Sequence, residues 1–223
     1  MTAIDLLGLP EELPPAAPKF PAAPFDGAGS FFDAYLEETV RAAGTIDWAE
    51  VERASALLTE AYRAGRTVFS CGNGGSAAIA NHLQCDHLKG VRTGTDLTPK
   101  VVSLSSNVEL ITAISNDFGY EEVFSYQLQS QSRPGDVLIA ISSSGRSPNI
   151  VQALEWAAEH GVRTIALTGF TGGAARAVTE VAIHVDCTNY GIVEDLHQAA
   201  MHAMAQYIRL SGMPLEAIAD TTF

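Results

Sequence analysis

The sequence predicts an α/β fold: a three-layer sandwich in which helices cover both faces of a five-stranded parallel sheet. Two observations predict it. Short apolar segments alternate with longer segments of helical periodicity from about residue 67 to residue 210, a pattern typical of a parallel sheet with helices on both faces. Hydrophobic residues make up 47% of the 223 residues, which is enough to build a full core at this length.

The N-terminal segment has a different composition. Six of the ten prolines fall within residues 1–27, and proline fixes φ and lacks a backbone N–H donor. We therefore expect residues 1–27 to form an extended, proline-rich arm and residues 28–223 to form a single domain. Two interpretations of the arm stay open: a mobile tail, or a segment that packs on a neighbouring subunit through Phe20 and Phe25.

Two helices are expected before the sheet. The first begins near residue 29, and apolar residues recur along it at three- and four-residue spacing. These residues are Phe32, Tyr35, Leu36 and Val40. The second helix covers residues 47–65, where Asp47 suits the N-cap, Glu50 would complete a capping box and Gly65 suits the position after the last turn.

The alternating part of the chain follows. Five apolar segments are expected to be strands, at 67–71, 100–105, 136–142, 164–169 and 181–186. Helices are expected at about 75–89, 107–115, 149–161 and 193–210, and a short segment rich in glycine and alanine follows the fourth strand. Ligands bind beyond the carboxyl ends of the strands in such sheets, so that edge is where a site is expected.

Two loops at that edge have the composition of phosphate-binding loops. The first joins a strand to a helix, and its candidate ligand-binding residues are Asn73, Gly74, Gly75 and Ser76. Glycine allows close backbone approach to a ligand, and the helix that follows offers free N–H groups. The loop also fits G-x-G-x-x-A, a loose dinucleotide fingerprint, and a tight turn without a ligand is a further alternative.

The second loop, residues 141–149, decides between these ligands. Its hydroxyl groups, which can donate to phosphate oxygens, belong to Ser142, Ser143, Ser144 and Ser147. Pro148 suits the first turn of the next helix. A dinucleotide site would not need this loop and would want an acidic residue near Ser105 or Ser106, where none stands. The two loops together therefore favour a sugar phosphate over NAD.

Composition and charge exclude several other classes. A net charge of −13 argues against nonspecific nucleic-acid binding, which needs a basic surface. The three cysteines are widely spaced and form no zinc or disulfide pattern, which is typical of a reducing cytoplasm. No apolar run approaches the ~18–20 residues of a membrane span, and no signal peptide is visible. We expect a cytoplasmic protein that binds neither nucleic acid nor membrane.

Four segments together resemble a known family. They are residues 71–78, 114–125, 135–154 and 164–173. These segments are similar to SIS (sugar isomerase) domains, and among them to the sedoheptulose-7-phosphate isomerases, also called phosphoheptose isomerases. The resemblance runs from about residue 30 to residue 210. It implies a SIS-type sandwich with N-terminal helices for oligomerisation, a homotetramer, and isomerisation of sedoheptulose 7-phosphate to a heptose 7-phosphate through an enediol, which feeds heptose biosynthesis.

The resemblance also implies roles for particular residues. The family carries a histidine and, four residues later, a glutamate on the helix after the first loop, and this chain has His82 and Asp86 there. On the last long helix the family carries a glutamine and, eight residues later, a histidine, where this chain has Glu194 and His202. The implied zinc ligands, one ion per subunit, are His82, Asp86, Glu194 and His202. Asp86 would be the catalytic base and His202 its acid–base partner.

The rest of the implied site holds the substrate. Phosphate would lie on Ser76 and the four serines of the second loop, and sugar hydroxyls on Asn73, Asn116 and Asp117.

The residues themselves are compatible with this site. Two histidines and two carboxylates make a reasonable zinc set, and His82 and Asp86 share one helix face. Glu194, Gln198 and His202 form one stripe, but its ends are separated by a rise of about 12 Å, so ligation of one ion by both ends demands converging side chains or a kink. Two other functions stay open: a non-catalytic SIS adaptor or sugar-phosphate sensor, and an isomerase for another sugar phosphate.

Overall fold

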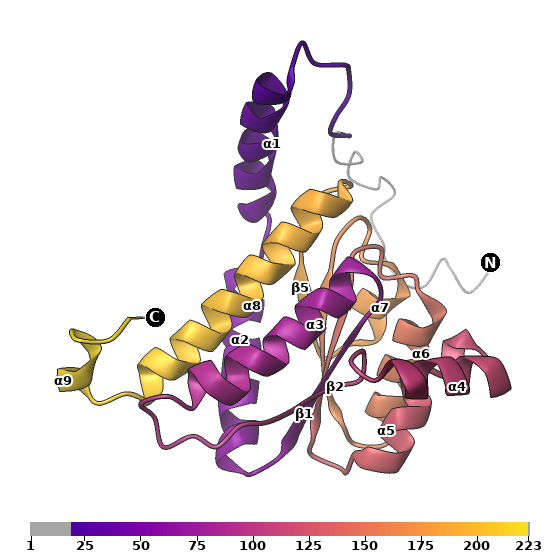
Figure 1. Ribbon diagram of the computed structural model, residues 1–223, viewed down its shortest axis with the longest axis vertical. Coiled ribbons are helices and arrows are strands. Elements are labelled where there is room, and N and C mark those ends of the chain that lie inside the picture. Colours follow the sequence, from indigo (N-terminus) through magenta and orange to yellow (C-terminus); the bar gives the residue numbers. More distant parts are fainter. Residues whose placement is uncertain (1–18, 223) are drawn as a thin grey trace, which may run out of the picture.

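A computed structural model describes residues 19–222 and contains, within that range, one sheet of five parallel strands (Figure 1). The strands are β1 Thr67–Gly72, β2 Lys100–Ser103, β3 Val137–Ser142, β4 Arg163–Thr168 and β5 Val181–His184. Their order in the sheet is β2-β1-β3-β4-β5, and every neighbouring pair is parallel. The predicted fold class is therefore confirmed.

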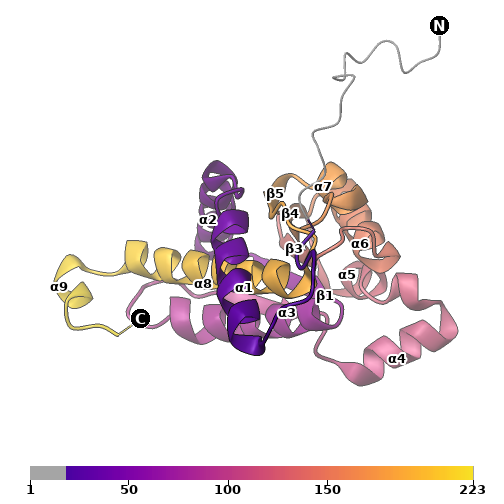
Figure 2. The same ribbon diagram turned by 90° about the horizontal axis from the view of Figure 1, so that it is seen from above.

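Helices cover both faces of this sheet (Figures 1 and 2). The α-helices of the described residues are α1 Ala28–Ala43, α2 Trp48–Arg63, α3 Gly75–Cys85, α4 Val108–Asp117, α5 Ser125–Gln131, α6 Pro148–Glu159, α7 Gly173–Val178, α8 Tyr190–Gly212 and α9 Leu215–Ile218. Helices α2, α3 and α8 pack on the face that receives Ile139 and Ile141 of β3. Helices α4 to α7 pack on the other face, which receives Leu138 and Ala140. The central strand is buried on both faces, as its continuous apolar sequence predicts.

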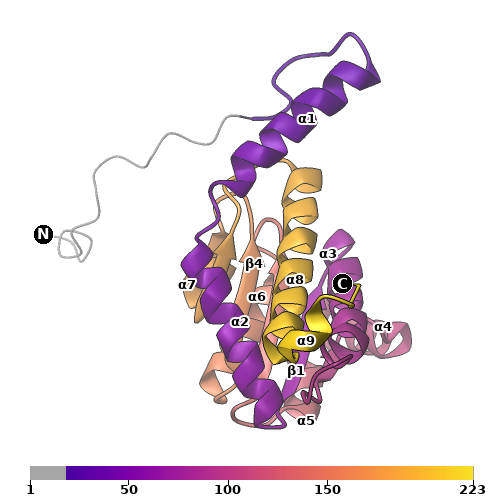
Figure 3. The same cartoon turned by 90° about the vertical axis from the view of Figure 1, so that its left-hand side faces the viewer.

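Helix α1 extends beyond the sheet (Figures 1 and 3). It leaves Phe32, Leu36 and Val40 exposed. The described part of the proline-rich arm returns along α1, since the Phe20 ring lies 5.6 Å from that of Phe31 and 6.2 Å from that of Tyr35, centroid to centroid. Residues 1–18 of the predicted arm lie outside the described residues.

The ends of α2 confirm one sequence prediction and correct another. The Asp47 side chain accepts a hydrogen bond from Ala49 N at 2.9 Å, as expected of an N-cap. The predicted capping box is wrong, because the Glu50 carboxylate instead accepts from Ala182 N at 3.0 Å, so it ties the helix to β5. Gly65 has φ 65° directly after the helix and closes it with a backbone bond to Tyr62, as predicted.

The helix predicted at 75–89 changes character partway. It is α-helical as far as Cys85 and then continues as a π-helix, η2 Asp86–Val91. π-Helical turns are rare in proteins, and those that occur are often found at functional sites. Within residues 19–222, no helix is both long and apolar enough to cross a membrane.

Candidate active site

Helices α3 and α8 lie side by side and run in the same direction away from the carboxyl edge of the sheet (Figures 1 and 2). Helix α3 follows β1, and α8 follows β5. Gly75, at the start of α3, faces Glu194 near the start of α8. About two turns further along α3, and one turn further along α8, His82 faces Gln198. The pair of helices therefore forms a track that starts at the two predicted loops.

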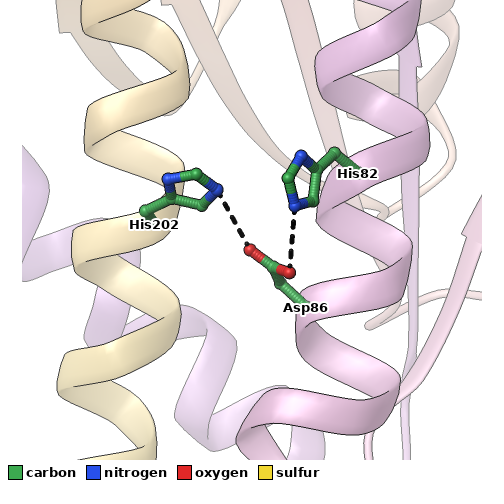
Figure 4. Close-up of side chains that lie close together, drawn as sticks. All are labelled: His82, Asp86 and His202. Carbon is green, nitrogen blue, oxygen red and sulfur yellow. Dashed lines mark ion pairs between the residues drawn. The ribbon is translucent and has the colours of Figure 1, made fainter. Parts of the chain in front are cut away.

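Three of the predicted functional side chains meet on this track (Figure 4). Asp86 Oδ1 lies 3.2 Å from Nε2 of His82, and Asp86 Oδ2 lies 3.3 Å from Nε2 of His202. One nitrogen or oxygen of each residue lies within 4.8 Å of the others, which is close enough for a shared metal ion. His82 is exposed, whereas Asp86 and His202 are half-buried. Both predicted catalytic residues and three of the four predicted metal ligands thus come together.

Gln198 also lies in this cluster, although sequence reasoning assigned it no role. Its Nε2 lies 2.8 Å from Nε2 of His202 and 3.3 Å from Nδ1 of His82. The signal that could have found it was its position on the stripe between Glu194 and His202, one turn before the histidine.

The two predicted loops line one cavity of ≈ 140 Å³ at the carboxyl ends of β1 and β3. The cavity is lined by Asn73, Ser76, Ile141, Ser142, Ser143, Ser144, Ser147, Tyr190 and Glu194. Ser76 and Ser147 line it at the starts of α3 and α6, and the N-terminal end of a helix attracts anions. The cavity is therefore suited to a phosphate group, and all five serines predicted to bind one line it, whereas Gly74 and Gly75 do not.

The serine hydroxyls of the second loop divide into two kinds. Ser142 Oγ accepts a bond from Gly145 N at 3.2 Å, and Ser144 Oγ accepts one from Arg146 N at 3.3 Å, so both stabilise the loop itself. Ser143 Oγ is buried and has no hydrogen-bond partner among the described residues. Ser147 is the N-cap residue of α6, yet its side chain makes no cap hydrogen bond. A buried polar group without a partner is costly, so the Ser143 hydroxyl is one that a ligand would satisfy. The half-buried Ser147 hydroxyl is not used as a cap, so it too can donate to a ligand.

Glu194 lines the cavity formed by the two loops, called the serine cavity below. It is not among the three clustered residues His82, Asp86 and His202. Its carboxylate packs so closely on Gly75 that any side chain at position 75 would collide with it. Burial raises the pKa of Glu194, and the neighbouring negative charge of Asp195 adds to this effect.

Asn116 and Asp117, the predicted sugar-binding pair, lie outside the cavity. They are exposed near the end of α4, and Asn116 Nδ2 donates to Asp117 Oδ1 at 2.7 Å. Asn73 does line the cavity, but its amide is held by other residues. Asn73 exchanges two 2.9 Å bonds with Asn149 and accepts a third, from Tyr120, also at 2.9 Å. Sequence reasoning missed Asn149, Tyr120 and the cavity residue Tyr190.

Comparison with known proteins shows the family to which the chain belongs. Residues 31–169 match the family described as SIS domain, which defines the class of protein. Phosphoheptose isomerases of Akkermansia muciniphila and Rhodospirillum rubrum are both 39% identical to the chain; the matches cover 71% and 69% of this chain and 84% and 81% of those proteins. The solved structure of phosphoheptose isomerase GmhA from Neisseria gonorrhoeae superposes with a TM-score of 0.75 and 32% identity, covering 82% of this chain and 98% of that one. The chain belongs to the phosphoheptose isomerase family of SIS-domain proteins.

Proposed function

We propose that this protein is a ketose–aldose isomerase that converts sedoheptulose 7-phosphate into a heptose 7-phosphate. One observation carries the proposal: Asp86 stands between two imidazoles on the same helical track that begins at the serine cavity. Family membership supports the same reaction, since the relatives are phosphoheptose isomerases.

The track suits a long open-chain substrate with phosphate at one end. The phosphate would enter the cavity, where Ser143 and Ser147 have hydroxyls to donate. The carbon chain would then lie between α3 and α8, so that C1 and C2 reach the cluster around Asp86. Separation of the two parts by about two helical turns, roughly 11 Å, favours a sugar of several carbons over a triose.

The chemistry is a proton transfer between neighbouring carbons. Asp86 would take a proton from C1, and the electron pair of that C–H bond would form the C1=C2 double bond of an enediol while O2 gains a proton. Asp86 would then return the proton to C2 as O1 loses its proton and becomes the aldehyde oxygen. His202, 3.3 Å from Asp86, would move the proton between O1 and O2.

A zinc ion fits the cluster by its donor chemistry. Two imidazole nitrogens and a carboxylate oxygen within 4.8 Å of one another are ligands that zinc prefers. His82, Asp86 and His202 would hold the ion. When bound, zinc would stabilise negative charge on the oxygens of the substrate.

Assembly and location are further parts of this proposal. The exposed apolar residues of α1, which are 59%, 47% and 74% exposed at Phe32, Leu36 and Val40, support burial of this helix between subunits, as in the predicted homotetramer. Exposed apolar patches of this kind mark interaction sites. A cytoplasmic location stays a prediction.

The test is a direct assay. The purified protein is incubated with sedoheptulose 7-phosphate, with and without added zinc, and the aldose product is quantified. We expect turnover that His202→Ala and Asp86→Asn abolish and that the exposed variant Glu159→Gln leaves unchanged. Absence of turnover under every metal condition would refute the isomerase.

A further inference from the structure

Asn73 and Asn149 form a reciprocal pair of amides at the serine cavity. Nδ2 of Asn73 donates to Oδ1 of Asn149, and Nδ2 of Asn149 donates to Oδ1 of Asn73, both at 2.9 Å. Asn149 is 1% exposed, and a buried amide needs such partners. Asn73 lines the cavity. The pair therefore fixes the plane of an amide group that a ligand in the cavity can reach.

Tyr120 adds a third hydrogen bond to this pair. Its hydroxyl donates to Oδ1 of Asn73 at 2.9 Å, so both lone pairs of this oxygen are used. One N–H of the Asn73 amide goes to Asn149, and no hydrogen bond among residues 19–222 uses the other N–H. This second N–H is therefore free to donate to a ligand.

The Tyr120 hydroxyl also affects which atom of the Asn73 amide is free. The reciprocal pair alone would form equally well with both amides rotated by 180°, and Asn73 would then offer an oxygen lone pair instead of an N–H. Donation from the Tyr120 hydroxyl stabilises the arrangement in which the oxygen faces the tyrosine and the N–H stays free. An N–H attracts the oxygens of a phosphate, whereas an amide oxygen repels them.

Tyr120 is itself attached to α6. It begins the 3₁₀-helix η3 Tyr120–Glu122. At the other end of η3, Oε1 of Glu122 accepts a hydrogen bond from Gln152 of α6 at 2.6 Å. Asn149 belongs to α6 as well. The tyrosine and the amide pair are thus held by the same helix, which keeps the hydroxyl within reach of the amide.

We propose that Tyr120 is a positioning residue for phosphate binding: its hydroxyl holds the Asn73 amide so that the free N–H of Asn73 donates to a phosphate oxygen in the serine cavity. The inference rests on the proposed function in one respect, the binding of a phosphate group by this cavity. It gives Asn73 the phosphate as its partner, rather than sugar hydroxyls, because Asn73 lines the cavity together with the five serines.

Phosphate affinity tests the inference without an activity assay. Inorganic phosphate is titrated into the full-length protein by calorimetry, and thermal unfolding verifies that each variant is folded. We expect Tyr120→Phe to weaken phosphate binding about 3- to 10-fold, because the Asn73 amide loses the bond that orients it. The matched control is Tyr126→Phe, which removes a hydroxyl from an exposed tyrosine of α5 and should leave the affinity unchanged.

A double-mutant cycle separates positioning from a general loosening of the cavity. Asn73→Ala should weaken phosphate binding by a similar factor, and adding Tyr120→Phe to it should cause no further loss, because the N–H that Tyr120 positions is already absent. Asn73→Asp guards against a folding failure of the alanine variant. It keeps an oxygen for Tyr120 and Asn149 but has no N–H, so it too should bind phosphate more weakly than the wild type.

Three results would overturn the inference. The first is wild-type phosphate affinity in Tyr120→Phe. The second is an equal loss of affinity when Tyr120→Phe is added to Asn73→Ala, which would mean that Tyr120 acts on the cavity by another route. The third is wild-type affinity in Asn73→Asp.

The inference and the isomerase proposal can fail separately. Phosphate binding that depends on Tyr120 through Asn73, in a protein without isomerase activity, would leave the inference standing and refute the function. An active isomerase whose phosphate affinity and KM are unchanged in Tyr120→Phe would leave the function standing and refute the inference. A wild-type protein that binds no inorganic phosphate would refute the inference whatever its activity.

Discussion

Oδ2 of Asp86 lies 3.3 Å from Nε2 of His202. This contact links the first residue of the π-helix η2 to the long helix α8. The other oxygen, Oδ1, faces His82 at 3.2 Å. The carboxylate thus lies between two imidazoles, close to the groups with which a general base would exchange a proton. Position 86 is therefore the most sensitive point of the proposed reaction.

Asp86→Asn should lower kcat by about 10²–10⁴-fold, the usual contribution of a positioned base, because an amide cannot accept the proton from carbon. Steady-state kinetics with sedoheptulose 7-phosphate check this, with Glu159→Gln as the control for an acidic residue lost from an exposed surface. A reduction of less than threefold in kcat would show that Asp86 is not the base.

The two free hydroxyls of the cavity should act on substrate binding. Ser143→Ala and Ser147→Ala should each raise KM about tenfold with little change in kcat, since a hydrogen bond to a charged group contributes about 1.5–3 kcal/mol. Ser130→Ala is the control, because it removes an exposed hydroxyl of α5 that does not line the cavity. Unchanged KM in both test variants would place the phosphate elsewhere.

Glu194 should oppose phosphate binding while it is charged. Since burial raises the pKa of this carboxyl, it becomes neutral at a higher pH than an ordinary glutamate, and phosphate affinity should improve as the pH falls through that value. Glu194→Gln should bind inorganic phosphate more tightly at pH 8 and should lose this part of the pH dependence. Calorimetric titration of both proteins with phosphate from pH 8 to pH 5 measures the difference between their affinities at each pH. Phosphate's own protonation affects both proteins equally, so it cancels in this difference. Parallel curves for the two proteins would contradict this role.

Behind the cluster, Tyr62 and His87 form a buried pair. The Tyr62 hydroxyl lies 2.6 Å from Nδ1 of His87, whose other ring nitrogen has no partner among the described residues. Burial lowers the pKa of His87 to about 4, so the ring is neutral at pH 7. Tyr62→Phe would leave both nitrogens unpaired and should lower the free energy of unfolding by about 1–3 kcal/mol.

Urea denaturation at pH 7 measures that loss, with Tyr207→Phe as a control that removes a hydroxyl from an exposed tyrosine of α8. Equal stability of Tyr62→Phe and the wild type would show that this hydrogen bond contributes nothing.

The strands and both loops could be predicted because their signals are local. An almost wholly apolar run such as Val137–Ser142 is expected between two layers of helices, where the structure buries it. The glycines and serines of the loops follow directly after strands. The meeting of Asp86 with His202 followed only from the family resemblance, since the two residues lie 116 positions apart in the chain.

Other features of the site depend on tertiary packing, which a single sequence does not display. How far α8 is shifted along α3 decides whether Glu194 or Gln198 faces His82, and the helical stripe contains both. The π-helix at Asp86 has no signal in the pattern of apolar residues. Asn116 and Asp117 are the last residues of α4, the helix that follows β2. They are exposed there and do not line the cavity.

The most direct test of the account is proton exchange at carbon. The zinc-loaded protein is incubated with sedoheptulose 7-phosphate in D₂O, and NMR follows deuterium at C1 of the ketose and at C2 of the aldose. We predict incorporation by the wild type and none by Asp86→Asn, because the enediol forms only when Asp86 takes the C1 proton. Equal incorporation by both proteins, or neither deuterium nor aldose with the wild type, would contradict the central claim that this carboxylate on the α3–α8 track isomerises a sugar phosphate.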